Sequence, residues 1–438
     1  MAADRDRAEP AARIGYGPEP WPDLEHALHR LALHDDKLGA VCLRLDDAAR
    51  RERTRGRTRA PLAGVPFGLK DVWDARDSFT TAGNLRHVRR RAGSDSLILR
   101  ALRDAGAVCV GRTNVSDLAA TPECANLLYG VTRNPHDLTR TSGGSSGGAA
   151  AAVASGMCAF DWGSDFGGSI RLPAAFCGVV GLRLPSRTFA VTGHFPFVPP
   201  ELGLHGQGPL ARTVAGVRTV VDAVRARLEF RRASPRDFVG VVVLGPDAFA
   251  AGEWPDAASD ISLALQDAGV SVRVGATPAP RDIHHAFAAL LSNHWRRFFG
   301  AFVGESALAG ICPGLGRARL HPHTQRIVAE LAIADRTRYR DLASTWRRVE
   351  AIRAACEALF DAGLLIATPT TTVPAPRLGH AHAKRELGVF AKLGNLLDAV
   401  ALAVPFGTFA SGMPRSLQLL GPPGSLDAVL ALGERLAP

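Results

Sequence analysis

The segment Thr141–Pro173 reads TSGGSSGGAAAAVASGMCAFDWGSDFGGSIRLP and contains two turns rich in glycine and serine. The first turn presents Ser145 and Ser146, and the second presents Ser169. Glycine lets a backbone turn sharply and approach a ligand closely. The stretch between the turns predicts a helix over SGGAAAAVASG and a strand over AFDWGSD, and a second helix opens at SIRLPAAFCG. Two serine-bearing turns this close together indicate a site for nucleophilic chemistry.

Lysine is rare in this chain, because only four of the 52 basic residues are lysine and the rest are arginine. The bias most simply reflects codon composition, so a lysine that is retained indicates a position at which arginine cannot replace it. Lys70 ends the apolar segment PLAGVPFGLK. Arginine stays charged in proteins, whereas a buried lysine can lose its proton and act as a base. Lys70 is therefore a candidate base, the alternative being a chance lysine at the end of a strand.

The composition is that of a globular α/β protein, with 438 residues, 46% of them hydrophobic and 21% charged. Strand and helix patterns alternate, which predicts a mixed, mostly parallel sheet covered by helices on both faces. No linker or internal repeat is visible. We therefore expect a loose N-terminus at residues 1–20 and a single large domain over residues 21–438.

The charge pattern does not favour a nucleic-acid partner. The net charge is +10, but the arginines are scattered and no motif interleaves them with aromatic residues. The seven cysteines include no C-x-x-C pair and lie mostly in apolar segments, which indicates reduced thiols and neither disulfides nor a zinc site. No apolar run is long enough to span a membrane. These features predict a cytoplasmic protein without a metal.

Gly143–Gly147 also matches G-x-S-x-G, the nucleophile elbow of α/β-hydrolases. That mechanism needs a later histidine, for which His380 and His382 are available, but it leaves the second turn without a task. A phosphate-binding loop is excluded because no Gly-Lys-Ser/Thr follows the glycines. A purely structural interpretation is that the glycines only allow close helix–sheet packing. It would account for one glycine-rich turn, but it is a poor account of two such turns together with a lysine in an apolar segment.

The chain resembles the amidase signature family of Ser–Ser–Lys hydrolases. The matching segments are GVPFGLKD, TTAG, GAVCVGRTN, RNP, all of Ser142–Gly181, GPLARTV, LLIATPTTTVPAP, AVPFG and LQLLGPPG. The resemblance covers roughly residues 22–225 and 355–437. It implies a signature core at about 60–225, a variable helical region at about 230–350 and a C-terminal closing segment at about 355–438.

The resemblance also implies roles for single residues. Lys70 would be the base, Ser145 a bridging serine preceded by a cis peptide bond, and Ser169 the nucleophile. The separations of these three positions match the spacing expected of the family. Lys70 must then be neutral to accept a proton, and burial under apolar neighbours such as Leu69 and Phe67 would lower its pKa.

The same resemblance places an oxyanion hole at the second turn. The backbone N–H groups of Phe166, Gly167, Gly168 and Ser169 would stabilise the negative charge that develops on the substrate carbonyl. Ala119 would form a wall of the acyl pocket.

Other residues of the second turn are expected to support this arrangement. Asp165 is expected to fix the glycine turn by hydrogen bonds, and Arg171 either supports the structure or receives a substrate carboxylate. Phe166 is larger than is usual at its position in the family, which would narrow the acyl pocket, and Trp162 is also large for its position.

The implied activity is hydrolysis of a linear carboxylic amide to an acid and ammonia or an amine, without a cofactor. Family members act on aliphatic, aryl, fatty-acyl or peptide amides. One alternative is the glutaminase subunit of a tRNA-dependent amidotransferase, which supplies ammonia to a partner protein. Another is a catalytically silent binding or scaffold protein. The presence of Lys70, Ser145 and Ser169 disfavours this alternative. The expected partner is a small amide, and the expected assembly is a homodimer.

Overall fold

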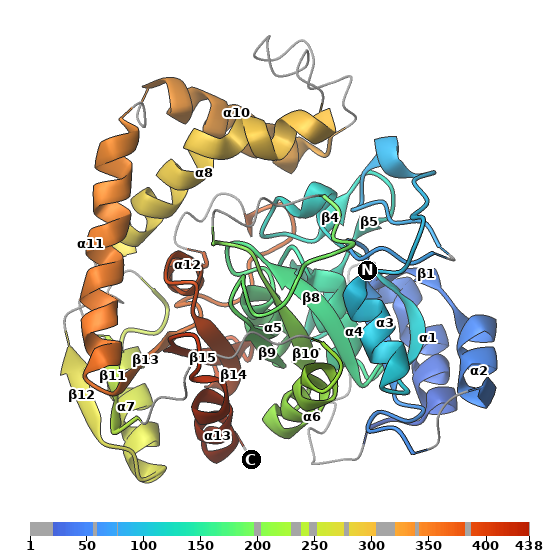
Figure 1. Cartoon of the computed structure of the whole chain (residues 1–438), viewed down its shortest axis with the longest axis horizontal. Helices are drawn as coiled ribbons and strands as arrows, with labels where there is room; N and C mark the ends of the chain where they lie inside the picture. Colours follow the sequence, from blue (N-terminus) through green and yellow to red (C-terminus); the bar gives the residue numbers. More distant parts are fainter. Residues whose placement is uncertain are drawn as a thin grey trace, which may run out of the picture.

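The structure, a computed structural model, describes residues 21–55, 59–76, 78–196, 203–228, 238–244, 252–275, 280–303, 320–337, 341–381 and 387–437. This part of the chain forms a single domain built on an eleven-stranded sheet in the order β1-β3-β2-β8-β10-β9-β14-β15-β13-β11-β12 (Figure 1). The predicted loose segment 1–20 lies outside the described residues.

The strands of the sheet are short and mostly buried. They are β1 (Val41–Arg44), β2 (Pro66–Lys70), β3 (Val108–Thr113), β8 (Phe160–Asp165), β9 (Val180–Arg183), β10 (Gly206–Ala211), β11 (Gly240–Leu244), β12 (Val272–Gly275), β13 (Leu364–Pro369), β14 (Val400–Thr408) and β15 (Pro414–Gly421). Two small hairpins lie outside it, formed by β4 (Ala125–Asn126) with β5 (Gly130–Val131) and β6 (Arg133–Asn134) with β7 (Asp137–Thr141).

The sheet is mixed, and the expectation that it is mostly parallel is wrong. Strands β3, β2 and β8 pair in parallel at one end, and β13, β11 and β12 do so at the other. Between these ends, the run β8-β10-β9-β14-β15-β13 is antiparallel throughout. Hydrophobic patterning identifies buried strands, but strand direction depends on long-range connections that the pattern does not contain.

Helices cover both faces of the sheet, as predicted. The helices are α1 (Leu24–Leu38), α2 (Asp46–Arg55), α3 (Leu97–Asp104), α4 (Gly147–Ala154), α5 (Arg171–Cys177), α6 (Val214–Arg225), α7 (Ala257–Asp267), α8 (Pro280–Val303), α10 (Pro322–Thr337), α11 (Leu342–Asp361), α12 (Val389–Leu396) and α13 (Leu426–Leu436). No helix in the described ranges is long and apolar enough to cross a membrane.

The alanine-rich segment forms helix α4, which packs closely on the sheet. Every residue of its sequence GGAAAAVA is buried, and the helix packs on β2, β8 and β10. Small side chains let the helix axis approach the sheet closely, so the turn that precedes α4 is held against the strand ends.

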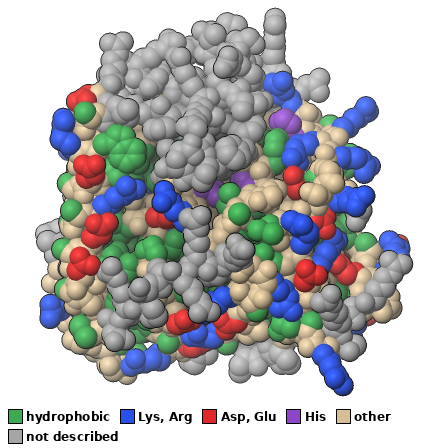
Figure 2. Space-filling model, in the orientation of Figure 1, with side chains coloured by type: hydrophobic (Ala, Val, Ile, Leu, Met, Phe, Trp, Pro, Cys, Tyr) green, Lys and Arg blue, Asp and Glu red, His purple; other side chains and the backbone are tan. Residues whose placement is uncertain are grey.

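The variable region at about 230–350 is not purely helical, because it contributes strands β11 and β12 to the sheet as well as several helices. Helix α8 packs on α10, α11 and α12, and α8, α10 and α11 are coloured yellow to orange in Figure 1. On the face shown in Figure 2, basic side chains are interspersed with acidic and apolar ones and form no single patch.

Candidate active site

Lys70 is the last residue of β2, and its side chain is completely buried. Its Nζ donates hydrogen bonds to Oγ of Ser145 at 2.7 Å and to the Oγ and carbonyl oxygen of Ser164 at 3.0 and 3.2 Å. Ser164 lies on the neighbouring strand β8, and Ser145 lies in the turn before α4. The structure therefore brings two of the three predicted catalytic residues into direct contact.

Burial lowers the pKa of Lys70 to about 7 from its usual 10.5, although the negative charges of Asp165 and Asp161 act in the opposite direction. Near neutral pH a large fraction of this side chain is therefore uncharged. A neutral amine keeps two N–H groups and one lone pair. The two N–H groups can bind Ser164, which leaves the lone pair to accept the proton of Ser145.

Ser145 sits in a crowded turn. The Gly144–Ser145 peptide bond is cis, as the resemblance implies, and Ser145 is almost completely buried. Its carbonyl oxygen accepts a hydrogen bond from the N–H of Ser116 at 3.2 Å. A methyl group at Gly144 would lie 2.5 Å from the carbonyl oxygen of Thr121, which explains why this position holds glycine.

Ser169 lies between β8 and α5 and is partly exposed, unlike Ser145. Its carbonyl oxygen accepts a hydrogen bond from the N–H of Ser146 at 3.1 Å, so the two serine turns are joined through their backbones. Gly168 precedes it with a φ of +106°, a conformation that favours glycine. Of the three predicted catalytic residues, Ser169 is the one that a ligand can reach from solvent.

The backbone of the second turn differs from the prediction at one position. The N–H of Gly168 donates to Oδ1 of Asp165 at 2.8 Å, and the N–H of Ile170 donates to Oδ2 at 3.1 Å. Gly168 is therefore already engaged and is not a vacant donor for an oxyanion. The N–H groups of Gly167 and Ser169 make no hydrogen bond to any residue that the structure describes.

Two further segments flank this turn. The ring of Phe166 lies against the ring of Phe287 on α8, with their centroids 6.2 Å apart, and a methyl group on Gly167 would crowd Phe287 at 2.9 Å. Ala119 has a φ of +56°, and its N–H binds the carbonyl oxygen of Ser116, the residue whose own N–H binds Ser145. The predicted wall residue thus lies in the segment that supports the first turn.

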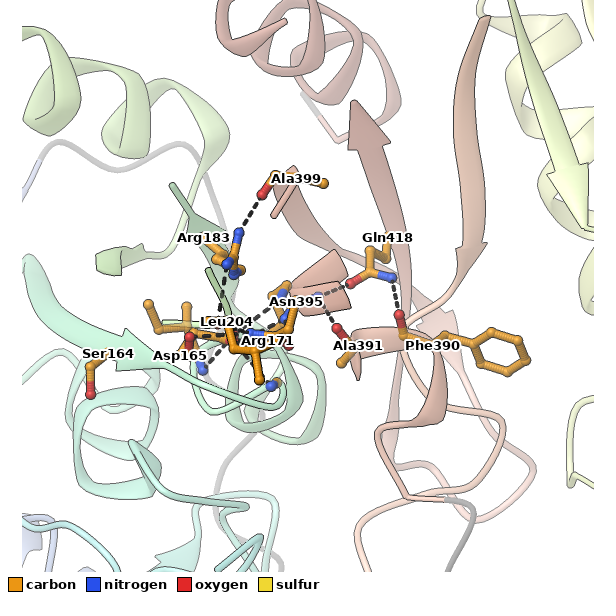
Figure 3. Close-up of polar contacts among 12 residues, drawn as sticks. Ser164, Asp165, Arg171, Arg183, Leu204, Phe390, Ala391, Asn395, Ala399 and Gln418 are labelled. Carbon is orange, nitrogen blue, oxygen red and sulfur yellow. Dashed lines mark hydrogen bonds and ion pairs between the residues drawn. The ribbon is translucent and has the colours of Figure 1, made fainter. Parts of the chain in front are cut away.

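Asp165 and Arg171 form a buried network that fixes the second turn (Figure 3). Arg171 donates to both carboxyl oxygens of Asp165, at 3.0 and 2.8 Å. It also donates to the Ala391 carbonyl oxygen, Gln418 Oε1 and Asn395 Oδ1, at 2.6, 2.6 and 2.7 Å. Arg171 is completely buried and saturated by protein acceptors. These contacts support the structural interpretation of Arg171 over a role in receiving substrate.

The same network explains the ionisation of Asp165. Burial alone would raise its pKa, but the charge and hydrogen bonds of Arg171, helped by Asn395, hold that pKa well below its usual range. Asp165 is therefore a carboxylate that anchors the Gly168 turn, which agrees with its predicted structural role. A carboxylate held this firmly is unsuited to donate a proton.

Sequence reasoning missed Ser164, which binds Lys70, and three residues in or beside this network, namely Arg183, Asn395 and Gln418. Gln418 and Asn395 are the single amide side chains in the mostly apolar segments SLQLLG and VFAKLGNL, and this was the available signal. As Figure 3 shows, both reach from the C-terminal segment toward Asp165 and Arg171.

The hydrolase-elbow alternative receives no support from the described residues. His380 is exposed, and its Nδ1 is 2.9 Å from the carbonyl oxygen of Leu378 in its own loop. His382 lies outside the described residues. The described residues also contain no group of three or more His, Cys, Asp or Glu side chains that could hold a metal ion.

The comparisons with known proteins agree with this geometry. A family model described as Amidase matches residues 24–430. AmiB2 of Mycobacterium tuberculosis is 32% identical over 94% of this chain and 91% of its own length. A glutamyl-tRNA(Gln) amidotransferase subunit of Moorella thermoacetica is 31% identical over 85% of this chain and 82% of its own. A crystal structure of an amidase superposes with a TM-score of 0.79 at 27% identity, covering 94% of each chain.

The family match spans both serine turns and the C-terminal residues that contact the second of them. Enzymes of this family are hydrolases that act on amides. The chain belongs to the amidase signature family.

Proposed function

We propose that the protein hydrolyses the C–N bond of a carboxylic amide through an acyl-enzyme on Ser169. The observation that carries this proposal is the 2.7 Å contact between Lys70 Nζ and Ser145 Oγ in a fully buried setting. A serine hydroxyl is a weak nucleophile until a neighbouring base removes its proton. Lys70 is such a base when it is neutral.

The proton path runs through two hydroxyl groups. Ser145 gives its proton to Lys70 and receives the proton of Ser169, so its own protonation state does not change overall. The Ser169 oxygen then attacks the amide carbonyl carbon. The backbone link between Ser146 and Ser169 supports this path, because it holds the two turns together.

The N–H groups of Gly167 and Ser169 stabilise the developing oxyanion. Both are available, whereas Gly168 is engaged with Asp165. Each such donor typically contributes ~3–4 kcal/mol to transition-state stabilisation. When the tetrahedral intermediate collapses, the proton held by Lys70 passes back through Ser145 to the leaving nitrogen. Water then attacks the acyl-enzyme by the same route and releases the acid.

The pocket walls in this proposal come from both signature and variable segments. Phe166 and Phe287 place aromatic rings beside Gly167, and Ala119 lies in the segment that supports Ser145. An aromatic lining favours amides whose acyl group is apolar or planar.

The test is an amide-hydrolysis panel that contains aliphatic, aryl, cyclic and glutamine amides. Ser169→Ala should abolish turnover, and Lys70→Ala and Ser145→Ala should each lower kcat/KM by roughly 10²–10⁴ at neutral pH. Matched controls are Lys37→Ala, an exposed lysine, and Ser155→Ala, a buried hydroxyl at the end of α4. Full activity in Ser169→Ala would remove the nucleophile from the proposal.

A second candidate function is the glutaminase subunit of a tRNA-dependent amidotransferase. The similarity to the Moorella thermoacetica amidotransferase protein over most of both chains favours it. The purified chain separates the two functions. An amidase turns over simple amides alone, whereas such a subunit shows substantial glutaminase activity only with its partners.

A further inference from the structure

A second titratable residue, Asp161, lies on the face of the sheet that carries Lys70. Asp161 on β8 pairs in parallel register with Gly68 on β2. Side chains at paired positions of neighbouring strands point to the same face, and so do residues two apart on one strand. A methyl group on Gly68 would overlap Oδ2 of Asp161. The carboxyl therefore fills the space above Gly68, one side-chain row away from Lys70.

The Asp161 carboxyl is buried, and few hydrogen bonds replace the hydration that it loses. Its side chain has no exposed surface, and neither oxygen makes a well-formed hydrogen bond with a residue in the described ranges. The nearest donors are the hydroxyl of Thr113 and the backbone N–H of Lys70. Burying a carboxyl without full hydrogen bonding costs stability, so this residue needs an explanation other than the fold.

The charged and titratable groups around the pair come from several elements. They are Asp71, Arg112, Cys124, Cys158, Asp165, His194 and His205. Most of the charged ones are already engaged, because Arg112 binds Asp71 at 3.2 Å and Asp165 binds Arg171 at 2.8 Å. Even so paired, Asp165 still acts on Lys70 and Arg112 still acts on Asp161, so the influence between Lys70 and Asp161 adds to these two effects.

The two groups influence each other in opposite senses. Burial raises the pKa of Asp161 to about 7, and the charge of Lys70 acts to lower it. The charge of Asp165 acts most strongly to raise the pKa of Lys70, and the charge of Asp161 acts in the same direction. Groups coupled in this way titrate as a pair. A negative charge on Asp161 therefore favours the ammonium form of Lys70.

We propose that Asp161 is a positioning residue whose carboxylate stabilises the ammonium that Lys70 becomes when it accepts the Ser169 proton through Ser145. This inference rests on the proposed function. Positive charge appears on Lys70 in a dry interior, where a negative charge on the next strand has a strong effect. Because the pKa of Asp161 is raised to about 7, its carboxylate form predominates above that pH. The proton moves from Ser169 to Ser145 and from Ser145 to Lys70, and Asp161 gains and loses none.

The kinetic test uses Asp161→Asn, which keeps the shape of the side chain and removes its charge. Without the carboxylate, Lys70 is a weaker base, so we expect kcat to fall about tenfold. The acidic limb of the pH profile of kcat/KM should move to lower pH by about one unit. KM should change little, because Asp161 is buried away from substrate. Asp161→Ala should show the same shift, because the effect comes from the charge.

A spectroscopic test does not depend on activity. The chain has four lysines, so a protein labelled with ¹³C at lysine Cε gives few signals, and Lys70→Met identifies the signal of Lys70. In Asp161→Asn the titration midpoint of Lys70 should move to lower pH. Asp117→Asn is the matched control, since it removes another buried carboxyl whose ionisation does not involve Lys70.

The two tests separate this inference from the proposed function. An unchanged Lys70 midpoint and an unchanged pH limb in Asp161→Asn would overturn the role of Asp161, even if Lys70→Ala is inactive. If Lys70→Ala keeps full activity, the proposed function fails, and this role for Asp161 fails with it. A drop in kcat without a shift in either pH measurement would assign Asp161 to folding alone and would also overturn the inference.

Discussion

Asp165 and Arg171 form an ion pair 2.8 Å long in which neither side chain has exposed surface. Asp165 accepts hydrogen bonds from two backbone N–H groups of the turn that carries Ser169, so the integrity of the pair determines the backbone geometry around Ser169.

We expect Arg171→Met to destabilise the protein by about 3–5 kcal/mol, because the Asp165 carboxylate would remain buried without its partner. Arg171→Lys should recover only part of this loss, since one ammonium cannot reach the same spread of acceptors. Urea unfolding monitored by circular dichroism measures both effects. Arg89→Met, at an exposed arginine, is the control and should change stability by less than about 0.5 kcal/mol. Equal unfolding midpoints for Arg171→Met and the wild type would contradict the prediction.

The depressed pKa of Lys70 also predicts how stability depends on pH. Between about 7 and 10.5, the unfolded chain binds a proton at this lysine that the folded protein does not. Stability contributed by this site therefore rises as the pH rises through that window, and the full penalty is present below it. Lys70→Met lacks this dependence. The stability of the wild type relative to Lys70→Met should increase from pH 6 to pH 9, and a constant difference would show that the lysine is not desolvated.

Gly144 supplies a test of the crowded first turn. A methyl group there would lie 2.5 Å from the Thr121 carbonyl oxygen and 2.7 Å from the Glu123 nitrogen, and both are backbone atoms that cannot turn away. Gly144→Ala should therefore lower the melting temperature strongly and abolish activity. Gly93→Ala is the matched control, because a methyl group at Gly93 would meet no atom within 4 Å. Similar melting temperatures for the two variants would show that the turn can relax.

The overlap between Gly68 and Asp161 predicts a coupled pair of substitutions. Gly68→Ala should destabilise the protein, because the new methyl group would collide with the Asp161 carboxyl. In an Asp161→Ala background, Gly68→Ala should lower the free energy of unfolding by a smaller amount. A double-mutant cycle of unfolding free energies should therefore show a favourable coupling. Additive effects would place the carboxyl elsewhere.

The sequence alone was enough to predict the local elements that build the site. The helices α4 and α5, the strand β2 and the contact between Lys70 and Ser145 agree with the expectations drawn from composition and resemblance. The direction of the central strands was not predictable, because it depends on which strands become neighbours, and pairs such as β9 with β14 join segments far apart in the chain.

The neighbours of Lys70 were only partly predictable from the sequence. Burial was predicted correctly, but Leu69 and Phe67 are not its neighbours, since residues an odd number apart on a strand face opposite sides. Phe67 stacks on Phe160 at 5.4 Å within the core of the other face. The surroundings of Lys70 are instead polar groups on β8 and the Ser145 turn, which only the strand order brings together.

The contacts of Arg171 have a consequence for how the protein is made. Its amide partners Asn395 and Gln418 lie 224 and 247 positions later in the chain. At roughly 5–20 residues per second, a ribosome needs on the order of ten seconds or more to add them after Arg171. During that interval the guanidinium of Arg171 and the carboxylate of Asp165 lack hydrogen-bond partners that Asn395 and Gln418 later provide. The turn that carries Ser169 is therefore not fully anchored until the residues up to Gln418 have been added.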